Sequence, residues 1–345
     1  MKLQLTGATT TIANLAKVTF WDGATKVGEG LFTSATNASD ASTTPSFPRS
    51  YASTTLTANF LIPKDGDKIM TIKGDLAAVG TSQSGTEGSW IKVDYDGGEV
   101  AATQGVGQSS GTTINTGSAS DTSSNGVRMF KTFPTVAKVA LSTNSLENGQ
   151  RSLLRFKVTA DSHGDVGLYK FTFTIATTGV NVDSIAVYGY VDSAFSNAAY
   201  ANGGLLNNTA VDLEALWADS TTNINVTFDP VGQGGTAEVI QVPAGTTRYF
   251  DVLGTVSNAS AGDSISTQLQ GDAAYPATAW QTFGPTAPDL LNAGTTDGVD
   301  NDTNDDFIWS PQATTTVSVS ANAFTNGYGV SGLPSTNLSA EILSK

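Results

Sequence analysis

The chain has 345 residues, of which 39% are hydrophobic and only 14% are charged, so it can build packed cores and is not a disordered chain. It has no cysteine and one histidine, which excludes a disulfide framework and a zinc site built from cysteines or several histidines. The net charge of −14 is concentrated after residue 170, where 17 acidic residues outnumber two basic ones, and this excludes nucleic acid as an expected partner.

The sequence contains no segment that predicts a membrane helix. Its apolar runs are all shorter than the eighteen or so residues that a span requires. The first fifteen residues also lack the apolar stretch of a signal peptide. A cytosolic protein and an exported protein whose signal has been removed both fit these facts, and the resemblance described below favours the second.

The first third of the chain reads as a series of short strands separated by turns. Asp22-Gly23 predicts a β-hairpin, and Pro63-Lys64-Asp65-Gly66 predicts a second turn between apolar runs. The polar segments 33–53 and 103–126 are predicted loops. The predicted strands are residues 2–6, 15–21, 26–32, 56–62, 68–76 and 89–95, and 127–133 leads into the next region.

Three alternating runs follow one another between Pro134 and Ile175. A period of two places one set of side chains on a buried face and the other on a solvent face. Asn148-Gly149 and His163-Gly164 separate the runs and favour turns. This region therefore predicts the opening of an antiparallel β-domain. Further strands are predicted at 184–191, 223–228, 237–242, 247–256 and 263–269, with one short helix at 213–217.

Three pairs of segments are similar and occur in the same order, which indicates an internal duplication. Residues 60–76 are similar to 240–256, residues 15–23 to 183–190, and residues 129–134 to 307–311. The sequence therefore predicts an all-β protein of two tandem antiparallel Ig-like β-sandwich domains. The predicted domains are 1–133 and 134–311, followed by a C-terminal extension, 312–345.

The duplication implies that the first domain lacks its two opening strands, because the counterpart of Met1 falls near Lys170. A β-sandwich without these strands exposes an unpaired edge and part of its core. Three explanations are open. The native chain can extend upstream, the strands at 135–160 can serve both domains, or another subunit can donate a strand.

The C-terminal extension is a candidate donor strand. In residues 312–321, Thr315, Val317 and Val319 alternate with small polar residues. The extension has no counterpart in the first repeat. The alternative is that it folds back on its own domain.

An acidic loop between residues 295 and 309 is a candidate Ca²⁺ site, because calcium binds several oxygen ligands from one short loop. It is not an EF-hand, since Asp305 replaces the glycine at the sixth position and Pro311 the glutamate at the twelfth. The alternative is a solvated acidic loop. The candidate ligands are Asp297, Asp300, Asp302, Asn304, Asp305 and Asp306. No other cofactor is expected.

No set of residues predicts catalysis. His163 lies in a turn-like sequence, and Glu214, Glu238 and Asp251 are candidates by residue type alone. We therefore expect no enzyme. Several tryptophans lie on predicted strands, and core packing is the expected role of each.

Two local sequences, Phe307–Pro311 (FIWSP) and Asn326–Pro334 (NGYGVSGLP), and the terminal LS-K resemble the C-termini of large surface proteins of candidate-phyla (Patescibacteria-type) bacteria. The DGATKVGEG hairpin and the repeat layout add to this resemblance. It implies a secreted subunit of a surface layer or filament, outside the cell, whose partners are copies of itself. The alternative function is an adhesin or glycan-binding module of the cell surface.

Overall fold

The computed structural model divides into two compact units, Met1–Lys131 and Thr132–Lys345, which are described separately here. No helix in the described part of the chain is both long and apolar enough to cross a membrane. The described residues are 1–6, 12–33, 50–79, 82–85, 87–97, 103–115, 121–207, 219–230, 238–274, 305–311, 324–333 and 337–345.

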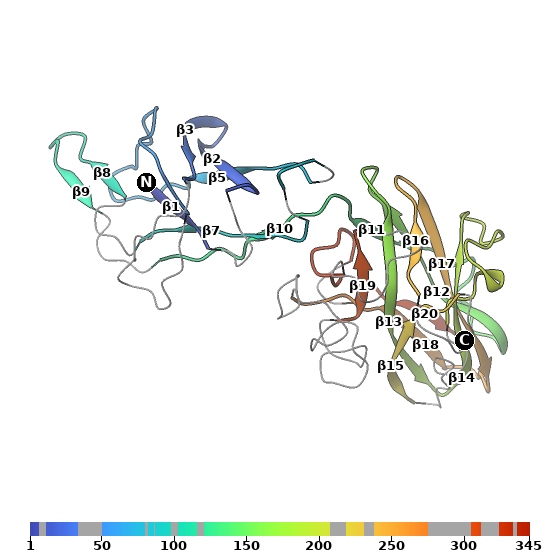
Figure 1. The fold of residues 1–345 in the computed structure, drawn as a ribbon. Coiled ribbons are helices and arrows are strands. Elements are labelled where there is room, and N and C mark those ends of the chain that lie inside the picture. Colours follow the sequence, from blue (N-terminus) through green and yellow to red (C-terminus); the bar gives the residue numbers. More distant parts are fainter. Residues whose placement is uncertain are drawn as a thin grey trace. The chain divides into compact units, whose positions relative to one another are not determined.

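The protein is an all-β protein, as the sequence predicts (Figure 1). All pairings between its named strands are antiparallel. The described residues contain one 3₁₀ turn, Asn202–Gly204, and no α-helix. The many valine and threonine residues explain this, because β-branched side chains favour strands over helices.

The described part of the first unit contains ten short strands in four small sheets. Their orders are β4-β1-β7, β3-β2-β5, β10-β6 and β8-β9. The strands are β1 (Lys2–Leu5), β2 (Leu15–Asp22), β3 (Thr25–Leu31), β4 (Ser50–Ser53), β5 (Thr71–Leu76), β6 (Trp90–Ile91), β7 (Val93–Tyr95), β8 (Gln104–Val106), β9 (Thr113–Asn115) and β10 (Val127–Arg128).

The core of the first unit forms where β1 packs near the hairpin of β2 and β3. Leu3, Val18, Phe20 and Val27 are almost completely buried in it. The hairpin turns at Gly23, whose φ of +58° suits glycine, and Asp22 pairs with Thr25 across the turn. This small core holds the strands that border the site described below.

Three expectations for the first unit are wrong. The predicted strand 56–62 is not a strand, because no neighbouring strand pairs with it in the described chain and Leu61 and Ile62 are exposed to solvent. The predicted loop 103–126 contains the hairpin of β8 and β9, which backbone hydrogen bonds between Gly107, Gly111 and Thr112 close. Strand β4 likewise lies at the end of the predicted loop 33–53.

The second unit consists of two larger sheets that pack face to face. One has the order β11-β12-β17-β14, and the other the order β15-β13-β18-β20, with β16 and β19 also paired to β13. The strands are β11 (Pro134–Val139), β12 (Gly149–Ala160), β13 (Val166–Thr178), β14 (Asn181–Tyr190), β15 (Thr221–Thr227), β16 (Ile240–Val242), β17 (Thr247–Ser257), β18 (Ser264–Leu269), β19 (Phe307–Ser310) and β20 (Glu341–Ser344).

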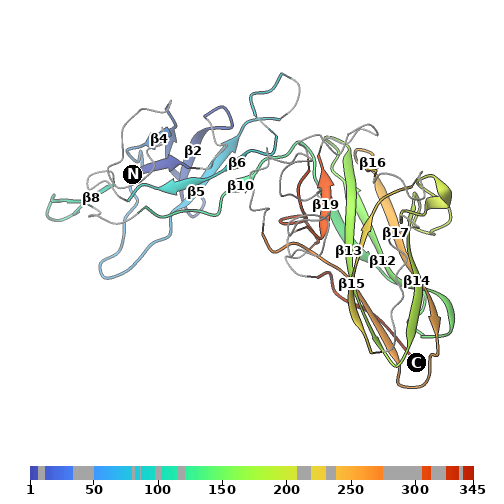
Figure 2. The same ribbon diagram turned by 60° about the horizontal axis from the view of Figure 1, so that its bottom comes forward.

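Figure 2 shows strands of both sheets in the second unit. Buried phenylalanine rings fill the space between these two sheets. Phe156 of β12 stacks on Phe250 of β17, with ring centroids 5.1 Å apart. It also meets the edge of Phe171 of β13 at 5.2 Å, and Phe171 stacks on Phe307 of β19 at 5.1 Å. Each buried ring removes a large apolar area from water, so these contacts join the two sheets into one core.

The predicted run from Pro134 to Ile175 is confirmed as strands β11, β12 and β13. The first two belong to one sheet and the third to the other. The five later predicted strands correspond to β14 to β18, with ends shifted by a few residues. The predicted helix 213–217 lies outside the described residues.

The described part of the C-terminal extension folds back on the second unit. Strand β20 pairs with β18, from Ser264–Ser344 to Thr267–Glu341. Thr325 exchanges two backbone hydrogen bonds with Trp309. In this structure the last strand therefore completes a sheet of its own chain, whereas residues 312–323, which include the alternating run, lie outside the described part.

Replacement of Leu343 by alanine should lower the free energy of unfolding of the second unit by about 2–5 kcal/mol, because the side chain is only 1% exposed. The neighbouring Ile342 is 54% exposed, so Ile342→Ala is a matched control with an expected change within about 0.5 kcal/mol. Urea unfolding of the full chain measures both. Equal effects of the two substitutions would show that β20 is not part of the core.

Candidate functional site

Strand β5 is an edge strand with an open side. It pairs with β2 along its whole length, from Thr71–Trp21 to Leu76–Leu15. No strand in the described part of the first unit pairs with its other side, and all six of its residues are exposed. The backbone groups on that side are available to a further strand.

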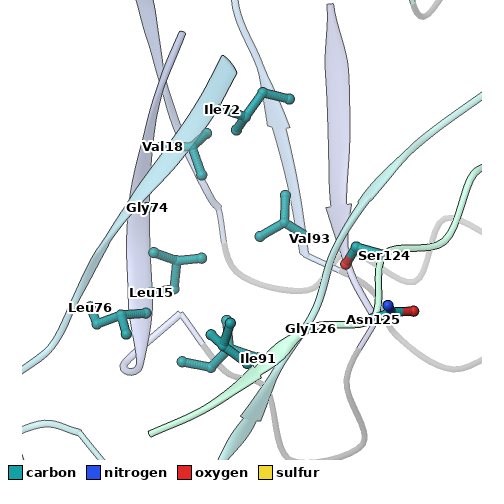
Figure 3. Close-up of a pocket in the computed structure, with 11 residues that line it drawn as sticks. Leu15, Val18, Ile72, Gly74, Leu76, Ile91, Val93, Ser124, Asn125 and Gly126 are labelled. Atoms are coloured by element: carbon teal, nitrogen blue, oxygen red, sulfur yellow. The ribbon is translucent and has the colours of Figure 1, made fainter. Parts of the chain in front are cut away.

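An apolar groove of about 500 Å³ lies beside this open edge. Figure 3 shows the labelled aliphatic side chains of β2, β5 and β6–β7 converging on one space, with Ser124 and Asn125 at one side. The lining residues are Leu15, Val18, Ile72, Gly74, Leu76, Ile91, Val93, Ser124, Asn125, Gly126 and Val127.

The groove joins the interior of the first unit to its surface. Leu15, Val18 and Ile91 are core residues, whereas Ile72 and Leu76 are exposed at the rim. Gly74 leaves room for the side chain of Leu15, because a Cβ atom at residue 74 would lie 2.9 Å from Cδ1 of Leu15. Since the lining is almost entirely aliphatic, the groove suits apolar side chains.

If the predicted duplication is correct, the open side of β5 corresponds to a position that is filled in the second unit. The similar segments in the sequence relate β2 to β14 and β5 to β17. Both pairs are antiparallel neighbours. Strand β17 also pairs with β12 on its other side, over ten residue pairs. Under this correspondence, the open side of β5 is the side that β12 occupies in the second unit.

Only the last part of the candidate calcium loop lies within the described residues. Asp297, Asp300, Asp302 and Asn304 lie outside the described residues. Within the part of the chain that the structure describes, no group of three or more histidine, cysteine or acidic side chains is arranged to hold a metal ion. Calcium binding at this loop therefore stays a prediction.

Asp305 forms an ion pair with Lys170 in the interior of the second unit. Lys170 Nζ lies 3.0 Å from Asp305 Oδ2, and both side chains are buried. Lys170 comes from β13, so the pair joins residues that are 135 positions apart. Burying two charges is costly, and removal of one partner from such a pair costs about 3–5 kcal/mol.

Asp272 holds together two segments that are distant in the sequence. Its carboxylate accepts backbone N–H groups from Asp306 at 2.9 Å, Phe307 at 3.3 Å and Gly327 at 2.6 Å. Burial raises the pKa of Asp272 to about 6. Burial, with the nearby charge of Asp272, raises the pKa of Asp306 to about 7. No local pattern in the sequence indicates Asp272, because only the fold brings its partners close to it.

The remaining sequence candidates do not come together in one described site. His163 is exposed and its Nδ1 lies 2.5 Å from Asp161. Asp251 is buried beside Arg155, with an Oδ2–Nη2 distance of 2.7 Å. Glu238 is exposed, and Glu214 lies outside the described residues.

No protein-family model matches the chain, and a comparison with curated proteins gives no match. Among solved structures, the C-terminal domain of the AgI/II polypeptide BspA of Streptococcus agalactiae is 10% identical, with a TM-score of 0.20, over 78% of this chain and 79% of that one. A structure of manganese lipoxygenase of Gaeumannomyces graminis with part of zonadhesin of Komagataella pastoris is 6% identical to this chain, with a TM-score of 0.16. The match covers 78% of this chain and 75% of that chain. These scores are too low to assign a fold.

The stability of the second unit should decrease as the pH rises from about 4 to about 7.5. Because the folded-state pKa values of Asp272 and Asp306 are raised, the native state keeps protons that the unfolded chain has already released. Their contribution to stability is complete below about pH 4 and is lost as the pH passes 6 to 7. Urea unfolding at several pH values measures this slope, and Asp306→Asn should flatten it. A slope unchanged by the substitution would contradict the assignment.

If the acidic loop binds calcium, saturating Ca²⁺ should raise the melting temperature of the chain relative to EGTA. A ligand at a hundred times its Kd stabilises the folded state by about 2.7 kcal/mol. Asp300→Asn combined with Asp302→Asn should remove the difference. Equal melting temperatures of the unsubstituted chain in Ca²⁺ and EGTA would rule out a stabilising site.

Proposed function

We propose that this protein is a structural subunit of an extracellular polymer, a filament or surface layer, whose copies associate head to tail through non-covalent contacts. The observation that carries the proposal is the open edge of β5 beside an apolar groove. An exposed edge with an adjacent apolar groove is an acceptor for a strand from another chain. Addition of a strand satisfies the backbone groups of β5 and covers Ile72 and Leu76.

The distribution of charge supports a contact between unlike units. Residues 1–131 contain 10 basic and 11 acidic residues, whereas residues 132–345 contain 7 basic and 20 acidic residues. Contact between two second units brings together surfaces of the same sign, which is unfavourable. Contact of the nearly neutral first unit with the acidic second unit of another copy avoids this repulsion, and such a contact repeats from copy to copy.

The sequence supports the same proposal in two ways. The duplicated segments favour two tandem Ig-like domains, of which the first lacks opening strands, and such a domain is completed by a strand from elsewhere. The resemblance to surface proteins of candidate-phyla bacteria favours a location outside the cell and a role in a surface layer or filament.

A group of aromatic side chains on the second unit favours the alternative function, a glycan-binding module or adhesin. Phe195 lies 5.7 Å from Tyr190 and 5.9 Å from Tyr249, measured between ring centroids. The Arg155 guanidinium lies 4.1 Å from the centroid of Phe195. Half-buried aromatic rings of this kind can stack on sugars. A glycan-binding module would stay monomeric at concentrations at which a polymer subunit associates.

Replacement of Leu76 by lysine should reduce self-association at least tenfold, because a charged side chain at the groove is unfavourable when a strand covers it. Leu76 is 46% exposed, so the subunit should fold normally. Leu31→Lys is the matched control, since Leu31 is 62% exposed on β3, the other edge of the same sheet. Light scattering and negative-stain imaging of the full chain measure the polymer.

Two outcomes of this experiment would contradict the proposal. An unsubstituted chain that stays monomeric at all concentrations contradicts the proposed function. A chain that associates equally well with Leu76→Lys and Leu31→Lys shows that the groove is not the contact.

A further inference from the structure

The sequence of strand β5 is complementary to itself about its glycine. The strand consists of Thr71, Ile72, Lys73, Gly74, Asp75 and Leu76. A lysine and an aspartate stand on either side of the glycine, and beyond them stand two aliphatic residues. When two copies of β5 run antiparallel with Gly74 opposite Gly74, each lysine faces an aspartate and each isoleucine faces a leucine.

We propose that the open edge of β5 pairs antiparallel with the same edge of a second copy, about a two-fold axis at Gly74. In this register Ile72 lies opposite Leu76 of the second copy, and Lys73 lies opposite Asp75. The two three-stranded sheets β3-β2-β5 become one six-stranded sheet that crosses both copies. This inference rests on the proposed function, because it names the strand that the open edge accepts.

No other register suits both faces of the strand. A shift of two residues in one direction places Lys73 opposite Lys73, and a shift of two in the other direction places Asp75 opposite Asp75. Like charges directly opposite each other are unfavourable. A shift of one residue places the apolar residues that line the groove opposite charged residues, although residues directly opposite in paired strands point to the same face.

On the groove side, the second copy covers apolar surface that a single chain leaves exposed. Ile72 and Leu76 line the groove and are 36% and 46% exposed (Figure 3). In the proposed register each of them packs against its counterpart, so two Ile72–Leu76 contacts form. No side chain separates these contacts, because the residue on the axis is Gly74. Removal of these side chains from water favours the pairing.

On the opposite face, the pairing extends an existing row of charges. Lys17 Nζ of β2 lies 3.5 Å from Asp75 Oδ2 and 4.0 Å from Glu29 Oε2. The Asp75 side chain is 69% exposed, so it has room for a second cation. Lys73 of the second copy supplies this cation, so that the signs alternate along the row. Charge complementarity of this kind fixes the register of an interface.

The alternative is that Lys73 keeps the edge free. A lysine on an edge strand commonly prevents pairing with other chains, and Lys73 Nζ already lies 4.4 Å from the centroid of the Trp21 ring in its own chain. Two observations favour pairing instead. Asp75 matches the charge of Lys73 in the symmetric register, and the apolar residues on the other face of β5 stay exposed unless a partner covers them.

The pairing is symmetric, so it joins copies two at a time and does not form a chain by itself. The contact between a first unit and the acidic second unit of another copy is therefore a separate contact. Head-to-tail contacts then connect the subunits of one row, and β5 pairing connects two rows that run in opposite directions.

Reversal of single charges tests the register. Lys73→Asp places acidic residues opposite each other and Asp75→Lys places basic ones, so each variant alone should form the β5 contact at least tenfold more weakly than the unsubstituted chain. An equimolar mixture of the two variants restores both pairs of opposite charges and should associate as the unsubstituted chain does. Analytical ultracentrifugation of the full chain measures this association.

The matched controls change the net charge by the same amounts outside β5. They are Lys26→Asp on β3 and Asp67→Lys, both at exposed positions, and neither should change the association. All four substitutions lie on the surface, so the melting temperatures should stay close to that of the unsubstituted chain.

Because the protein has no cysteine, disulfide cross-linking tests the same register independently. Ile72→Cys chains mixed with Leu76→Cys chains should form a dimer under mild oxidation at least tenfold faster than either variant alone. The reason is that residues 72 and 76 of different copies lie opposite each other, whereas two residues 72 are separated by four positions. Ile72→Cys mixed with Leu31→Cys, exposed on β3, is the control.

The outcomes separate this inference from the proposed function. Charge-reversed variants that associate as strongly as the unsubstituted chain, or a mixture that associates no better than its components, overturn the inference alone, because another occupant then fills the edge. A protein that stops at a dimer with the expected charge dependence supports the pairing and contradicts the polymer. An unsubstituted chain that stays monomeric at all concentrations contradicts both.

Discussion

An edge strand presents unpaired backbone groups along one side, and β5 combines such an edge with an apolar face that the described first unit leaves partly uncovered. The open core of that unit follows from this constraint. The core of that unit opens at the surface, because no described residue fills the groove between β5 and strands β6 and β7. Three buried residues lie at the bottom of this groove: Leu15, Val18 and Ile91. In the second unit, by contrast, strand β17 has a hydrogen-bonded neighbour on each side, β12 and β14, and its Phe250 side chain is fully buried.

The difference between the two units also explains which parts of the fold the sequence predicts well. Strands β12 and β17 are long and bury alternate side chains over part of their length, so their period of two is visible in the sequence. Strand β13 is buried on both faces over its first eight residues, which the alternation in its sequence does not predict. The segment 56–62 has the same composition but no neighbouring strand in the described unit, and a local pattern does not show whether a partner exists. Polar β8 and β9 pair with each other through turn geometry, which hydrophobic alternation does not reveal.

The site was predictable only in part for the same reason. The duplication predicts that the first domain lacks strands, but it does not show which edge is open or that aliphatic side chains line a groove there. The acidic loop is visible in the sequence as a pattern of charges. Its buried ion pair is not, because Asp305 pairs with Lys170, which lies 135 residues away in the chain. Asp272 had no local signal, because its three backbone donors come from residues 34 to 55 positions later in the chain.

The buried acidic residues of the second unit lie at both ends of one connection of the chain. Asp305 and Asp306 directly precede β19, and Asp272 joins β19 to Gly327, so these residues fix both ends of the connection that contains residues 312–321. Opening this part of the second unit would leave the buried charges of Lys170 and Asp305 unpaired and would remove three hydrogen bonds from the carboxylate of Asp272. The same contacts that make burial of these carboxylates costly therefore oppose local opening of the chain at this place.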